Sequence, residues 1–190
     1  MHSAYGGKPK SVLKKDLLAL LAGVDRRSIG RADEVAAMVL KHPALFAELI
    51  AGLWDLDPVV RMRAADAAEK VSRKQPELLH PFKAELLGLL AEATEQELRW
   101  HLAQMAPRLP LTQTERLRAA SLLKDYLNDR SSIVKTFAMQ ALADLANADP
   151  ALRPEIVELL EEAMRNGTPA LRARGRKLLA QLRRVDIKDR

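Results

Sequence analysis

The sequence predicts an all-α protein, a right-handed α-α superhelix of about five helical hairpins. One observation is a pattern that returns at intervals of 36 to 38 residues, as it does in stacked helical repeats. A second is composition, because Leu and Ala dominate while aromatic residues make up only 4% of the 190 positions. Leu and Ala favour helices, whereas strands are enriched in β-branched and aromatic residues.

The repeat is marked by an apolar–basic pair that opens each predicted second helix. The basic members, which follow one another at intervals of 38, 36 and 37, are Arg61, Arg99, Lys135 and Arg172. The clear repeats are expected near residues 43–71, 81–109, 117–145 and 154–182. A degenerate pair over residues 11–41 would cap the stack, since terminal repeats depart from the pattern. Residues 11–182 are therefore expected to form a single solenoid domain, between a flexible arm (residues 1–10) and a basic C-terminal tail (residues 183–190).

The first helices carry their own start and stop signals. Ser11 is the expected N-cap of the first helix of the chain, and Gly23 is placed to end that helix. Later first helices show apolar residues at intervals of three and four. Three of them begin near a proline, which the first helical turn tolerates because its N–H has no partner there. These prolines are Pro43, Pro81 and Pro154.

The second helices share one apolar stripe. At offsets 0, 4, 7, 8 and 11 from the apolar member of each pair, every residue is apolar or small in all four helices. The first and last of these columns are Val60, Leu98, Val134, Leu171 and Val71, Leu109, Leu145, Leu182. This spacing places the side chains on one face of a helix, so the stripe is predicted to be buried between repeats.

These features resemble the HEAT-repeat family of armadillo-like helical solenoids, clearly over residues 43–182 and weakly over residues 11–40. Six positions before the basic residue, three repeats carry an acidic or amide residue, and the second repeat carries Ala93. Those three residues are Asp55, Asp129 and Asn166. The resemblance implies that this acidic–basic ladder joins neighbouring repeats by internal hydrogen bonds. It implies a scaffold fold, which does not specify a partner.

Composition and motifs limit the classes of function. The chain has no Cys, which excludes thiol catalysis, disulfides and Cys-ligated zinc, and which suits a reducing compartment. No signal peptide or membrane span is evident, so a cytoplasmic protein without membrane contact is expected. The chain is also expected to be a monomer. No phosphate-binding loop, nucleophile elbow or zinc-protease helix is present, and His42 and His80 lack a third metal ligand. The protein is therefore expected not to be an enzyme, and no cofactor or metal is expected.

The exposed side of the second helices is the expected binding surface, because the concave face of a helical solenoid is the one that usually binds. The candidate residues are Arg63, Trp100, His101, Gln104, Arg108, Phe137, Gln140, Arg174 and Lys177. Trp100 and Phe137 are the expected anchors for a protein partner, since aromatic residues and Arg dominate interface hot spots. The alternative that each aromatic ring fills a gap between repeats stays open.

A net charge of +6 raises the alternative of an anionic partner. The candidate polyanion patch is Arg172, Arg176, Arg183 and Arg184, and a second basic group is Lys8, Lys10, Lys14 and Lys15. A non-enzymatic protein-interaction scaffold is the favoured function, and a nucleic-acid-binding module is the alternative. A third alternative is an enzyme of the DNA-glycosylase type, because the chain is broadly similar to the HEAT-like alkylpurine DNA glycosylases. No motif here matches theirs.

Overall fold

The computed structural model describes residues 12–24 and 28–188. Within this part of the chain there are ten α-helices, joined by turns and short 3-10 segments, and no strand. The prediction of an all-α fold is therefore confirmed. The expected arm over residues 1–10 and the expected N-cap Ser11 lie outside the described residues, as do Lys8 and Lys10 and the side chains of Lys14 and Lys15.

Contacts between helices divide the chain into two compact units, residues 1–78 and residues 79–190. The single solenoid domain expected over residues 11–182 stays a prediction. In the first unit, α1, α2 and α3 all pack against α4. Its helices are α1 (Val12–Leu21), α2 (Ala32–Lys41), α3 (Phe46–Ala51) and α4 (Pro58–Lys74), with 3-10 turns η1 (Pro43–Leu45) and η2 (Gly52–Trp54) on either side of α3.

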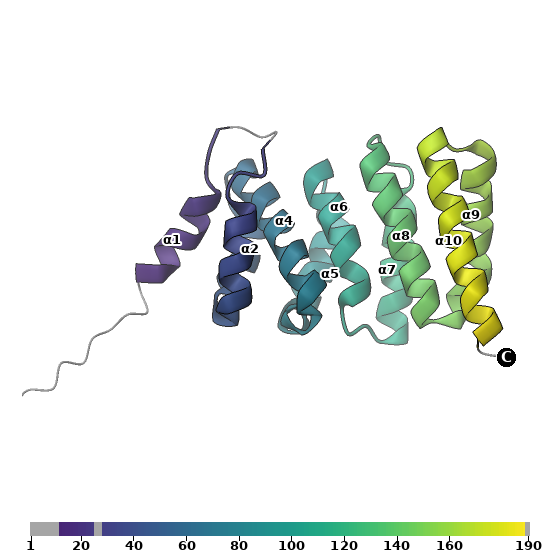
Figure 1. Cartoon of the computed structure of the whole chain (residues 1–190), viewed down its shortest axis with the longest axis horizontal. Helices are drawn as coiled ribbons and strands as arrows, with labels where there is room; N and C mark the ends of the chain where they lie inside the picture. The colour runs from purple at the N-terminus through teal and green to yellow at the C-terminus, as the bar shows by residue number, and fades with distance from the viewer. Residues whose placement is uncertain (1–11, 25–27, 189–190) are drawn as a thin grey trace, which may run out of the picture. The chain divides into compact units, whose positions relative to one another are not determined.

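The second unit consists of three helix pairs. Helices α6, α8 and α10 lie side by side in one layer, and α5, α7 and α9 form the layer behind them (Figure 1). The pairs are α5 (Lys83–Glu92) with α6 (Gln96–Met105), α7 (Gln113–Tyr126) with α8 (Ser132–Ala148), and α9 (Arg153–Asn166) with α10 (Pro169–Lys188). The 3-10 segments are η3 (Pro76–Phe82), η4 (Ala106–Arg108) and η5 (Pro150–Leu152). Because α10 continues to Lys188, most of the segment expected as a tail is helical.

The helix starts follow from local side chains. Asp57 accepts a hydrogen bond from the Val59 amide (2.8 Å), which satisfies an amide that has no partner within α4. Thr112 and Glu115 form a reciprocal capping box at the start of α7. Ser131 caps α8 by accepting from the Val134 amide (3.4 Å). Asp57 and Ser131 thus fix where the second helices α4 and α8 begin, and hence the register of their apolar stripes.

The apolar stripe is buried in all four second helices, from Val60 in α4 to Leu182 in α10, as predicted. Fully burying a Leu side chain contributes roughly 1.5–3 kcal/mol, so the stripes are a main source of stability. A Cβ atom at Gly175 would lie 2.9 Å from Met164 Cγ and 3.2 Å from the Leu160 carbonyl oxygen. The small residue at this column therefore allows α10 to approach α9 closely.

Candidate functional site

No helix among residues 12–24 and 28–188 is long and apolar enough to cross a membrane. In the same part of the chain, no group of three or more His, Asp or Glu side chains is placed to hold a metal ion.

Two basic residues of the acidic–basic ladder, Arg61 and Arg172, donate hydrogen bonds to backbone carbonyls in the turns of their own repeats. Arg61 donates through Nη1 to the backbone carbonyls of Asp55 (2.6 Å) and Leu56 (3.1 Å). Arg172 donates through Nε to the Gly167 carbonyl (2.8 Å), and not to the side chain of Asn166 as the resemblance implied. Both guanidinium groups therefore stabilise the turn that precedes their helix.

Arg99 makes the bond between repeats that the resemblance implied. Its Nε donates to the Ala93 carbonyl (2.8 Å) within its own turn, and its Nη1 donates to the Asp129 carboxylate of the next helix pair. The same guanidinium lies over the ring of Tyr126, with Cζ 4.6 Å from the ring centroid. The Tyr126 hydroxyl donates to the Leu90 carbonyl (2.7 Å), so the two helix pairs are joined at several atoms.

The two acidic groups of this cluster respond to their surroundings in opposite ways. Burial raises the pKa of Tyr126 to about 12, against the opposing effect of the Arg99 cation. Burial would also raise the pKa of Asp129, but hydrogen bonds from the Ser131 amide and the Arg99 guanidinium lower it overall. The Arg99–Asp129 pair is therefore ionised at neutral pH, with a neutral phenol packed beside it.

Two predicted binding residues are buried, so the expectation that they lie on an exposed face is wrong. Arg63 is 4% exposed and His101 is 7% exposed. Arg63 donates through Nη1 to the carbonyls of Leu21 (2.9 Å) and Ala22 (3.0 Å), and through Nε to the Ser28 carbonyl (3.1 Å). The backbone that follows α1 covers Arg63, which makes its role structural.

The other seven predicted residues lie on the adjacent helices α6, α8 and α10 and on η4 in the second unit. This second-helix face consists of Trp100, Gln104, Arg108, Phe137, Gln140, Arg174 and Lys177. Lys177 is exposed, and the other six are half-buried. The Gln104 amide donates to the Trp100 carbonyl (3.3 Å), and the Trp100 and His101 ring centroids are 5.4 Å apart. The Trp100 ring therefore contacts His101, while the residue stays partly accessible to solvent.

Asp144 adds a carboxylate to this face that the sequence reasoning did not select. Gln140 donates to its Oδ1 (2.7 Å), and Arg108 and Arg174 both interact with it electrostatically. Loss of water around the carboxyl raises the pKa of Asp144, and this effect exceeds the opposing effects of Gln140 and the two arginines. The second-helix face therefore holds a mixed polar cluster, in which one acid interacts with Gln140 and with two cations.

Two of the four residues of the predicted polyanion patch, Arg176 and Arg183, lie in one cleft. All four arginines of the patch are exposed, but Arg172 is engaged with the Gly167 carbonyl. Arg176 and Arg183 line a shallow cleft of about 490 Å³ between α9 and α10, together with Arg165. Glu161 lies in the same cleft and pairs with Arg183 (3.4 Å). The cleft thus holds three cations and one anion.

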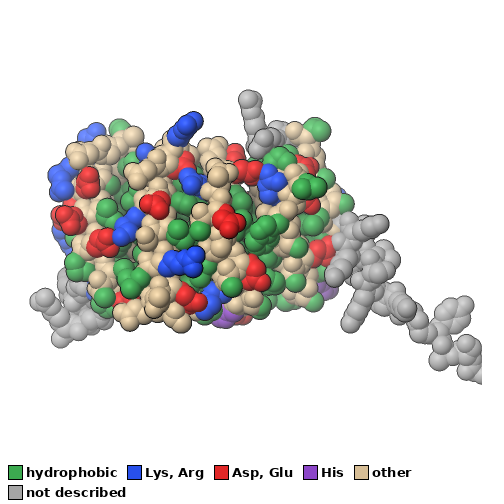
Figure 2. All heavy atoms as spheres, turned by 180° about the vertical axis from the view of Figure 1, so that it is seen from behind, with side chains coloured by type: hydrophobic (Ala, Val, Ile, Leu, Met, Phe, Trp, Pro, Cys, Tyr) green, Lys and Arg blue, Asp and Glu red, His purple; other side chains and the backbone are tan. Residues whose placement is uncertain are grey.

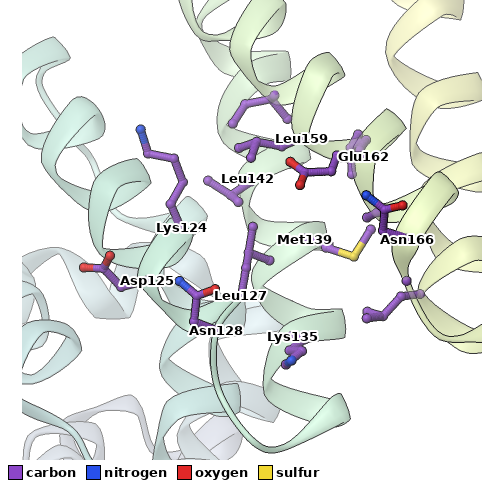
Figure 3. A pocket seen from close by; sticks show the side chains of 15 residues that line it. Lys124, Asp125, Leu127, Asn128, Lys135, Met139, Leu142, Leu159, Glu162 and Asn166 are labelled. Atoms are coloured by element: carbon purple, nitrogen blue, oxygen red, sulfur yellow. The ribbon is translucent and has the colours of Figure 1, made fainter.

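A second concavity, of about 560 Å³, lies between α7 and α9, and the sequence reasoning missed it (Figure 3). Met139 and Leu142 of α8 form part of its apolar floor, and Lys135 and Asn166 lie at its polar edge. Its other lining residues are Lys124, Asp125, Leu127, Asn128, Ile156, Leu159, Leu160, Glu162, Ala163, Gly167 and Leu171. We refer to this concavity as the α7–α9 groove.

Comparison of the chain with protein-family models and with curated proteins finds no match.

Proposed function

We propose that this protein is a non-enzymatic interaction scaffold, a HEAT-like helical solenoid that binds a protein partner through the second-helix face. The observation that carries the proposal is the placement of Trp100 and Phe137. Both are half-buried on adjacent helices, with Arg108 and Arg174 on the same face. Partly exposed aromatic rings bury a large area at a low cost in conformational entropy, and aromatic residues and Arg dominate interface hot spots.

The charge arrangement of this face favours a protein partner over a polyanion. Asp144 interacts electrostatically with Arg108 and Arg174, and its carboxylate would repel a phosphate backbone. A protein surface offers both signs of charge and apolar area, and it matches a mixed cluster of this kind. The expectations of a cytoplasmic location and a monomeric state remain predictions.

The test is comparative affinity purification followed by titration with the purified partner. The double variant Trp100→Ala and Phe137→Ala should lose partners that the wild type and the control Leu117→Ala retain. Leu117 is a suitable control because it is exposed on α7, away from this face. Trp100→Ala alone should weaken binding about 30-fold, the loss that corresponds to a hot spot of about 2 kcal/mol. Equal affinity in all variants would contradict the proposal.

The cleft between α9 and α10 supports nucleic-acid binding as a second candidate function. Arg165, Arg176 and Arg183 together could neutralise about three phosphates, which predicts a slope of about −2.7 in log K against log salt concentration. Binding to labelled duplex and single-stranded DNA and RNA should then show this slope, and Arg176→Ala should reduce it by about 0.9. No binding at low salt would eliminate this candidate.

A further inference from the structure

The two interfaces between neighbouring helix pairs of residues 79–190 are filled differently at the same register positions. At the first interface, Arg99 stacks on the Tyr126 ring and bonds to the Asp129 carboxylate. Each of these three positions has a counterpart 36 or 37 residues further along the chain. The counterparts of Arg99, Tyr126 and Asp129 are, in that order, Lys135, Ala163 and Asn166.

All three counterparts line the α7–α9 groove. The groove therefore lies where the second interface has a methyl group at Ala163 in place of the tyrosine ring of the first. Its volume of about 560 Å³ falls within the usual range for ligand pockets, roughly 300–1,000 Å³. In Figure 3, Met139 lies between Leu127 and Asn166, with Lys135 below it and Leu142 above it.

We propose that the α7–α9 groove binds an acidic segment of a partner protein, which inserts an aromatic side chain beside Ala163 and places a carboxylate against Lys135. The inserted ring and carboxylate would reproduce what Tyr126 and Asp129 supply at the first interface. A Lys ammonium is attracted both to the face of an aromatic ring and to a carboxylate, as the Arg99 guanidinium is. The Asn166 side-chain amide supplies a further donor at the same edge.

The charges around the groove define which guest it selects. Lys135 is half-buried and acts on Asp129 only electrostatically, whereas Arg99 hydrogen-bonds the same carboxylate. Lys124 is paired with Glu155 (2.6 Å) and is less able to take a guest carboxylate. Asp125 and Glu162 also line the groove, and their negative charges restrict the guest to a carboxylate placed directly at Lys135. Lys135 is therefore the cation on which recognition depends.

This site is separate from the second-helix face. On α8 the groove uses Lys135, Met139 and Leu142, at intervals of four and three residues. The second-helix face uses Phe137 and Gln140, which point to nearly the opposite side of the same helix at 100° per residue. The surface of the chain seen from behind mixes acidic, basic and hydrophobic side chains (Figure 2). The inference therefore stands or falls independently of the proposed function.

The test is fluorescence anisotropy with a labelled peptide of residues 122–129, which carries the Tyr and Asp of the first interface. Binding to the full-length protein should weaken about tenfold in Lys135→Gln, and about tenfold when the peptide's Tyr is replaced by Ala. Ala163→Tyr should abolish binding, because the new ring occupies the groove. Glu162→Gln should tighten binding, because it removes the opposing charge.

Matched controls separate these effects from loss of folding. Ala84→Tyr places the same side chain at an exposed position of α5, and Lys74→Gln removes an exposed cation of α4, so both should leave peptide affinity unchanged. Thermal melts of every variant check the fold. Peptide binding that is absent, or that survives Ala163→Tyr in a folded protein, would overturn the inference. In that case a higher melting temperature for Ala163→Tyr would identify the groove as a packing gap alone.

Discussion

The Arg99 guanidinium lies over the ring of Tyr126, with its carbon 4.6 Å from the ring centroid, and so joins one helix pair to the next. The phenol hydroxyl donates to the carbonyl of Leu90 (2.7 Å), which belongs to the same helix pair as Arg99. One residue type at one register position thus supplies both an aromatic surface and a buried hydrogen bond. The stability of residues 79–190 should depend strongly on this contact.

Tyr126→Phe tests the contact through pH. At neutral pH the free energy of unfolding of the variant should be about 1 kcal/mol lower than that of the wild type, since the variant loses the hydrogen bond to Leu90. Burial raises the pKa of Tyr126 to about 12, above the unfolded value of about 10. The neutral phenol therefore stabilises the fold fully below about pH 10, and this contribution of roughly 2–3 kcal/mol is lost as pH rises through about 12.

Tyr126→Phe carries no such dependence, so the order of stability should invert at high pH. Urea unfolding of both proteins between neutral pH and about pH 12 measures this directly. A constant difference across that range would show that the phenol is free to ionise in the folded state.

The Glu115 carboxylate should make the stability of the protein depend on pH in the acidic range. A hydrogen bond from Lys83, with others from Thr112, lowers the pKa of Glu115 from 4.5 to about 2. Because the folded pKa is depressed, the stabilisation is present above about pH 4.5 and is lost as pH falls through about 2. Glu115→Gln should therefore melt at a lower temperature than wild type at neutral pH and at the same temperature near pH 2. A difference in melting temperature that persists near pH 2 would show that the variant loses stability through packing and not through the charge of Glu115.

Arg63→Ala should be a stability variant and not a binding variant. Three backbone carbonyls accept hydrogen bonds from its buried guanidinium. A hydrogen bond to a charged group contributes about 1.5–3 kcal/mol to stability. We expect the free energy of unfolding to fall by roughly 2–3 kcal/mol. The same substitution at exposed Arg118 should change it by less than about 0.5 kcal/mol. Denaturant unfolding compares the two, and equal effects would contradict the structural role of Arg63.

Two glycines offer opposite outcomes for the same substitution. Gly30 has φ +53°, and a Cβ there would lie 2.7–2.9 Å from the Arg63 guanidinium, so Gly30→Ala should cost about 1–3 kcal/mol. Gly88 lies within α5, and nothing lies within 4 Å of a Cβ built there. Gly88→Ala should therefore stabilise the protein by roughly 0.5–1 kcal/mol, measured by chemical denaturation. If both substitutions raised, or both lowered, the free energy of unfolding, the difference between the two sites would be refuted.

The helices and the buried stripe could be predicted because both are properties of one helix and its period. Val60 and Leu182 lie in the core because the same offsets recur in every second helix. Arg63 could not be placed in this way. Its register position is shared with half-buried Phe137 and Arg174, and its burial comes from backbone more than thirty residues earlier in the chain.

The α7–α9 groove was hidden for a related reason. The replacement of Tyr126 by Ala163 at the same register position is visible in the sequence, but its meaning depends on knowing that the ring bridges two repeats. Contacts across an interface follow from side-chain directions in three dimensions, and a period alone does not supply these. Once the first interface is known, the second can be read from the sequence.

The most direct test of the proposed function is site-specific photo-crosslinking from the second-helix face in cells. A photoreactive phenylalanine analogue replaces Trp100, which is half-buried on α6, or Leu117, which is exposed on α7 as the control. The scaffold proposal predicts a discrete crosslinked protein from position 100 and none of the same species from position 117. Crosslinks to nucleic acid, or the same products from both positions, would contradict it.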